Sequence, residues 1–69
     1  MVIIYGKEAC PYTQKAIDDC RRRGMAFEYV DVKRAKADLD RMLQANGGHR
    51  RVPTVVADDG KVTIGFGGS

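Results

Sequence analysis

Cys10 is the residue of this 69-residue chain whose type and setting best suit chemistry. It opens the stretch Cys10-Pro11-Tyr12-Thr13, between a predicted strand and the first turn of a predicted helix. Unpaired backbone N–H groups and the helix dipole favour a negative charge there, and Lys7 adds a cation upstream. We therefore expect a thiol of lowered pKa that reacts as a thiolate. The alternative, a buried and inert cysteine, fits this polar loop poorly.

Thr13 occupies the position at which a C-x-x-C motif would carry its second cysteine. Threonine cannot form a disulfide, so the two-cysteine cycle of a thioredoxin-type reductase is not available here. Cys20 lies about 15 Å further along the predicted helix, beyond disulfide reach of Cys10. Its place on an apolar helical face with Ala16 and Ile17 favours core packing. Any thiol that resolves Cys10 must then come from outside the chain.

His49 and the net charge offer weaker signals. His49 lies beside Gly47, Gly48 and Arg50, which favours a solvated loop residue over a metal ligand or a general base. Cys and His lack the spacing of a metal site, so we expect no metal. Twelve Lys and Arg against nine Asp and Glu give a net charge of +3, and the chain has no Trp. The basic and aromatic surface of a nucleic-acid-binding protein is therefore not indicated.

The chain is short enough that we expect a single domain over residues 1–69. Two cysteines do not make a disulfide scaffold, which favours a reducing compartment. The apolar stretch Val2-Ile3-Ile4-Tyr5 is too short for a signal segment or a membrane span. We expect a cytoplasmic protein that binds neither membrane nor nucleic acid.

Apolar periodicity and turn residues predict six elements. The predicted strands are 2–5, 27–32, 54–57 and 61–64, and the predicted helices run from Pro11 to before Gly24 and over 36–46. A helix joins the first two strands, which predicts a parallel pair. Asp58-Asp59-Gly60 predicts a tight antiparallel hairpin between the last two. The fold class is α/β, with a four-stranded mixed sheet in the order βαβαββ.

Three segments together resemble the glutaredoxin family, in the family's order and spacing. Lys7-x-x-Cys10-Pro11-Tyr12-Thr13 is similar to the active-site segment with its final cysteine replaced. Arg51-Val52-Pro53-Thr54-Val55 resembles the Thr-Val-Pro loop and the following strand, with Arg51 in place of threonine. Gly67-Gly68 resembles the family's paired glycines. The resemblance implies a thioredoxin-like fold in which the usual C-terminal helix is short or absent.

A narrower similarity involves the end of the chain. The segment Val62-Thr63-Ile64-Gly65-Phe66-Gly67-Gly68 and the Cys-x-x-Thr pattern resemble a bacterial glutaredoxin-like group. Some members of that group carry selenocysteine at the Cys10 position.

The family resemblance also implies a glutathione site. Val52 is implied to precede a cis peptide bond at Pro53 and to pair through its backbone with the cysteinyl part of glutathione. Basic side chains are implied to hold the glycyl carboxylate, and the glycine pair with Ser69 to meet the γ-glutamyl end. The candidates for the glycyl carboxylate are Lys7, Arg50 and Arg51, with His49 as a further one. The implied site comprises the catalytic Cys10 and the glutathione-binding residues Lys7, Tyr12, Thr13, Arg50, Arg51, Val52, Pro53, Gly67, Gly68 and Ser69.

The implied function is that of a glutathione-dependent thiol–disulfide oxidoreductase, which acts by a monothiol route on glutathione mixed disulfides. Glutathione is then the co-substrate, glutathionylated or disulfide-containing proteins are the partners, and the chain is a monomer. Two alternatives stay open. One is an iron–sulfur cluster carrier that uses Cys10 of two chains and two glutathiones, although such carriers typically show Cys-Gly-Phe-Ser. The other is a glutathione-binding module without turnover.

Overall fold

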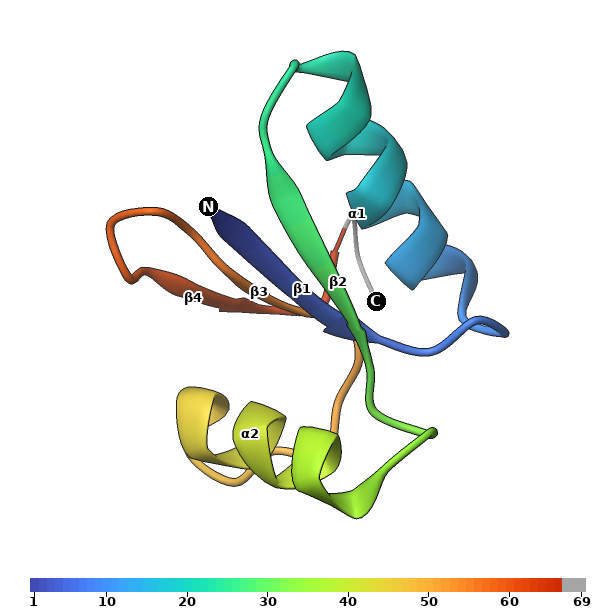
Figure 1. Ribbon diagram of the computed structural model, residues 1–69, viewed down its shortest axis with the longest axis vertical. Helices are drawn as coiled ribbons and strands as arrows, with labels where there is room; N and C mark the ends of the chain where they lie inside the picture. The colour runs from blue at the N-terminus through green and yellow to red at the C-terminus, as the bar shows by residue number, and fades with distance from the viewer. Residues whose placement is uncertain (67–69) are drawn as a thin grey trace.

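The computed structural model describes residues 1–66, as a four-stranded mixed sheet with one helix on each face (Figure 1). The elements are β1 (Val2–Gly6), α1 (Pro11–Arg22), β2 (Phe27–Asp31), α2 (Lys36–Asn46), β3 (Thr54–Val56) and β4 (Val62–Ile64). The predicted order βαβαββ is confirmed. The observed bounds differ from the predicted ones by a single residue at some ends, where pairing or helical hydrogen bonds stop earlier or later than the apolar pattern does.

Strand β1 lies in the middle of the sheet, whose order is β2-β1-β3-β4. It runs parallel to β2 and antiparallel to β3, and β3 and β4 form the antiparallel hairpin. Both predicted pairings are confirmed. A central strand is covered on both faces, which explains why β1 is apolar at successive positions and why Ile4 is 0% exposed.

The sheet separates two small cores, because successive strand residues point to opposite faces. On the α1 face, Val2 and Ile4 pack with the apolar side of α1, including Ala16, Ile17 and Cys20. Cys20 is buried there, as the helical periodicity predicted. On the α2 face the buried cluster consists of Tyr5, Val30, Val32 and Met42. Among the described residues, no helix combines the length and the apolar character needed to cross a bilayer.

Gly6 lets the end of β1 lie directly against the first turn of α1. A Cβ atom at this position would overlap the Cγ2 and Oγ1 atoms of Thr13. Thr13 is itself 2% exposed, so it cannot turn outward to make room. The contact therefore determines how closely the loop that carries Lys7 and Cys10 follows the sheet.

We predict that Gly6→Ala destabilises the fold by about 1–3 kcal/mol, the usual cost of overpacking a tight contact. Denaturant unfolding followed by circular dichroism measures the change. In a Thr13→Ala background the overlapping atoms are gone, so the same substitution should cost clearly less. An equal cost in both backgrounds would contradict the assignment of the strain to this contact.

Candidate active site around Cys10

The backbone at Cys10 positions its sulfur at the N-terminus of α1. Cys10 is the N-cap residue, with φ −88° and ψ 113°, and Pro11 follows in the first turn. Its N–H donates to the carbonyl of Lys7 at 3.1 Å, and its carbonyl accepts the N–H of Thr13 at 3.1 Å. The Cys10 side chain is half-buried. The sulfur is thus reachable from solvent, yet held beside the backbone N–H groups of Tyr12 and Thr13 at the helix start.

The surroundings of Cys10 favour the thiolate. Burial alone would raise the pKa of the Cys10 thiol. Hydrogen bonds from the Thr13 side chain, from the backbone N–H groups of Thr13 and Tyr12, and the charge of Lys7 more than offset it, so the pKa lies below its ordinary value. This is the direction predicted from the sequence. The hydroxyl of Thr13, a residue expected as the replacement of a second cysteine and as part of the glutathione site, lowers the pKa of Cys10 more than any other group does.

Thr13 also fixes the loop before Cys10. Its Oγ1 accepts the backbone N–H of Lys7 at 3.4 Å, a long hydrogen bond across the base of the loop. The same oxygen can donate its proton to the sulfur, since a hydroxyl is both acceptor and donor. One buried side chain therefore links the end of β1, the loop and the reactive sulfur.

Val52 brings the second half of the site to Cys10. The Cys10 sulfur lies 4.0 Å from the carbonyl oxygen of Val52, although the two residues are far apart in the sequence. The Val52-Pro53 peptide bond is cis, as the family resemblance implied. Pro53 is buried, and its carbonyl accepts the N–H of Gly65 at 2.7 Å, which ties the loop to the end of β4.

A buried polar network holds the loop that leads to Val52. The amide of Asn46 donates to the His49 carbonyl at 2.7 Å and to the Thr54 hydroxyl at 3.0 Å, and its oxygen accepts the His49 N–H at 3.0 Å. The Thr54 hydroxyl in turn donates to the Arg51 carbonyl at 2.9 Å. The sequence predicted Asn46 only as the last residue of a helix and did not predict this network, because its partners become neighbours only in the folded chain.

Beside Val52 lies a pocket of about 200 Å³ with a cationic rim. Lys7 and Arg50, both predicted as glutathione-binding residues, line it together with Val52. Lys33 lines it as well and was missed. In the sequence, the only sign of this role is that Lys33 is a cation directly after the predicted strand 27–32. The remaining lining residues are apolar: Val32, Leu39 and Met42.

The structure does not bring every predicted residue to this pocket. Arg51 is exposed and does not line it, although its carbonyl holds the loop. His49 is exposed and interacts through its backbone. Tyr12 is half-buried, with the Lys15 ammonium 5.0 Å from its ring centre. Gly67, Gly68 and Ser69 lie outside the described residues. Within residues 1–66, no three His, Cys, Asp or Glu side chains gather as a metal site would require.

Comparison with known proteins identifies the family. The glutaredoxin family model matches residues 2–62, which is most of the chain. The chain belongs to the glutaredoxin family. Membership supports a thiol–disulfide oxidoreductase function related to glutathione in the broad sense, and it confirms the resemblance drawn from the three sequence segments. No curated protein gave a significant sequence match to this glutaredoxin-family chain.

Solved structures agree with this assignment. A glutaredoxin (grx-1) from Archaeoglobus fulgidus is 26% identical with a TM-score of 0.82, over 94% of this chain and 74% of that one. The thioredoxin-like protein BC3987 is 30% identical with a TM-score of 0.84, over 96% and 88%. A buckwheat glutaredoxin in complex with glutathione shares the fold at 22% identity and a TM-score of 0.73, over 93% and 59%. The thioredoxin-like fold is thereby confirmed.

We predict that Thr13→Val raises the pKa of the Cys10 thiol, because the variant loses the hydroxyl hydrogen bond that favours the charged sulfur. Below its pKa the thiol is protonated and slow to react, so a raised pKa lowers the alkylation rate at neutral and acidic pH. The rate of alkylation by iodoacetamide, measured from pH 4 to 10, gives the midpoint directly. An unchanged midpoint would show that the hydroxyl does not support the thiolate.

Proposed function

We propose that this chain is a glutathione-dependent thiol–disulfide oxidoreductase that reduces glutathione mixed disulfides through Cys10 alone. The observation that carries the proposal is the position of Val52. Its carbonyl oxygen lies 4.0 Å from the Cys10 sulfur, and the same residue lines the cationic pocket. A tripeptide whose central residue lies along Val52 therefore brings its own sulfur to Cys10 while its carboxylate reaches the pocket.

The pocket suits the glycyl carboxylate of glutathione. Lys7, Lys33 and Arg50 surround it with positive charge, and arginine can bind a carboxylate through two parallel hydrogen bonds. The cysteinyl part of glutathione would pair with the backbone of Val52, as a short strand pairs with its neighbour. This binding mode places a cation of the protein near one end of the ligand and leaves the ligand sulfur facing Cys10.

The reaction proceeds by two exchanges. The Cys10 thiolate attacks the glutathione sulfur of a mixed disulfide, a new S–S bond forms, and the substrate thiolate leaves and takes up a proton. A second glutathione thiolate then attacks the Cys10 adduct, which releases oxidised glutathione and restores the Cys10 thiolate. The lowered pKa of Cys10 helps in both exchanges, because the thiolate is the nucleophile in the first and the leaving group in the second.

The second exchange needs an outside thiol, because this chain offers Cys10 no internal partner. Thr13 replaces the nearby thiol of a C-x-x-C pair. Cys20 is buried in the core on the α1 face, where burial and the neighbouring Asp19 carboxylate raise the pKa of its thiol. A buried thiol that stays protonated is a poor nucleophile. Free glutathione is the natural resolving thiol in a cytoplasmic monomer. The cytoplasmic location, the monomeric state and the bacterial glutaredoxin-like subgroup stay predictions.

We predict that Cys10→Ser abolishes turnover of a small glutathione mixed disulfide, whereas Cys20→Ser keeps most of it. A coupled assay with glutathione, glutathione reductase and NADPH measures both. Mass spectrometry after treatment with oxidised glutathione should find the adduct on Cys10. Binding of glutathione without turnover in the unmodified chain would favour the non-catalytic module, and a stable coloured dimer after anaerobic iron–sulfur reconstitution would favour the carrier.

We predict that Lys33→Ala raises the KM for the same mixed disulfide about fivefold, the size expected for the loss of one partly exposed charge contact. Its kcat should hardly change, because Lys33 contacts a part of the ligand that does not react. Lys61→Ala is the matched control, since Lys61 is exposed in the β3–β4 hairpin and lies outside the pocket. Equal effects of the two substitutions would argue against a carboxylate in this pocket.

A further inference from the structure

The outer edge of β2 carries backbone groups that no other strand of residues 1–66 pairs with. β2 is an edge strand and pairs only with β1. The carbonyl of Ala26 and the N–H of Val32 both bond to β1. Since backbone groups alternate in direction along a strand, those of Phe27 and Tyr29 point away from the sheet. An unpaired edge of this kind is a template for another extended chain.

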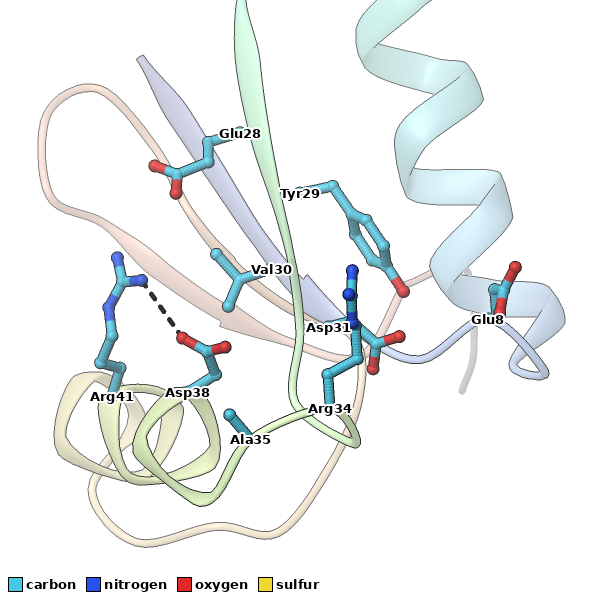
Figure 2. Close-up of a pocket in the computed structure, with 9 residues that line it drawn as sticks. All are labelled: Glu8, Glu28, Tyr29, Val30, Asp31, Arg34, Ala35, Asp38 and Arg41. Carbon is cyan, nitrogen blue, oxygen red and sulfur yellow. Dashed lines mark ion pairs between the residues drawn. The ribbon is translucent and has the colours of Figure 1, made fainter.

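A pocket of about 780 Å³ follows this edge (Figure 2). Glu8, Tyr29 and Asp31 border it on the side of α1, and Asp38 and Arg41 of α2 border it on the other side. We call it the edge trough. Its lining follows β2 from Glu28 to Asp31 and includes residues from both sides of the sheet, so an added strand would lie between these side chains.

The charges of the edge trough differ from those of the chain as a whole. Arg41 and Asp38 pair with each other at 3.6 Å. The other charged lining residues are three acids and one base: Glu8, Glu28, Asp31 and Arg34. The chain carries a net charge of +3, so this acidic surface stands against a basic background. It would attract a basic segment and repel an acidic one.

The hydroxyl of Tyr29 adds an unsatisfied polar group to the edge trough. It is buried and has no hydrogen-bond partner among the described residues. Burial raises the pKa of Tyr29, and the negative charges of Asp31, Glu8 and Cys10 raise it further. The hydroxyl thus stays protonated and lies within the electrostatic influence of the active-site loop, so the strand edge and that loop are neighbours in space.

We propose that the edge trough docks an extended, lysine- or arginine-bearing segment of the protein substrate, which adds to β2 as a fifth strand. β1 and β2 are parallel, so the Asp31 end of β2 lies at the same end of the sheet as the Cys10 loop. Glu8, just before Cys10, lines the trough. A docked segment therefore leads toward the reactive sulfur. This inference rests on the proposed function and names the class of protein substrate that it serves.

Amide exchange tests the docking itself and does not depend on catalysis. The reduced, nitrogen-15-labelled chain is mixed with a nine-residue, cysteine-free peptide of alternating Lys and Thr, and exchange is followed by NMR. The Phe27 and Tyr29 amides should exchange about tenfold more slowly, while those of Glu28 and Val30, already bonded to β1, should not change. A peptide of alternating Glu and Thr should have no effect. Two further forms of the basic peptide are each methylated at alternate backbone amides. The form whose methyl groups fall on the amides that would bond to β2 should give no protection, and the other form should protect as before.

Activity separates this inference from the proposed function. Two peptides of equal length, one basic and one acidic, each carry a glutathionylated cysteine at one end. Glu28→Lys should lower kcat/KM for the basic peptide about fivefold and leave the small mixed disulfide unaffected. The control is Asp40→Lys, since Asp40 is exposed on α2 and does not line the trough.

Protection at Phe27 and Tyr29 by the basic peptide alone supports docking at the edge trough. Protection confined to the β4 edge or to the Cys10 loop, or equal binding of acidic and basic peptides, would overturn it. Loss of turnover on the small disulfide with intact protection of β2 would instead count against the proposed function and leave docking in place.

Discussion

The contact between Gly6 at the end of β1 and Thr13 in the first turn of α1 is the constraint on which the site depends. It lets the strand end approach the helix closely enough for a buried hydroxyl to reach both the Lys7 amide and the Cys10 sulfur. The helix start then supplies N–H groups that no side chain caps. The lowered pKa of Cys10 is therefore a result of this packing as well as of the Lys7 charge.

The other half of the site is positioned by a different device. Two buried polar side chains, Asn46 and Thr54, bond the loop backbone at His49 and Arg51, and the cis bond turns the chain at Val52. Buried polar groups that satisfy each other hold a loop more firmly than apolar packing alone. The carbonyl of Val52 and the side chain of Arg50 are thus presented by a loop whose anchors lie on α2 and β3.

Much of the fold could be predicted because it depends on local patterns. The apolar run of β1, the apolar periodicity of the helix over 36–46 and the Asp59-Gly60 turn each indicate their structure within a few residues. Cys10 could be predicted for the same reason, since its loop and helix start are contiguous. Lys33 and Asn46 could not be predicted as parts of the site. Their partners lie in distant parts of the sequence and become neighbours only when β2, α2 and the loop at Val52 pack together. The effect of the Thr13 hydroxyl on the pKa of Cys10 was not predicted, because the sequence was interpreted there mainly through the absence of a second cysteine.

Thr13 also determines how an exchange cycle at Cys10 would respond to its surroundings. A second thiol in the same helical turn would attack the Cys10 adduct at a very high effective molarity. Release of glutathione from Cys10 would then hardly depend on the concentration of thiol in solution. With a hydroxyl in that position, release is a bimolecular step, and its rate is proportional to the concentration of reduced thiol outside. The lifetime of the Cys10 adduct would therefore report the supply of reductant. In the proposed cycle, the buried Thr13 hydroxyl that packs against Gly6 would thus make the turnover of Cys10 depend on the concentration of reduced thiol in solution.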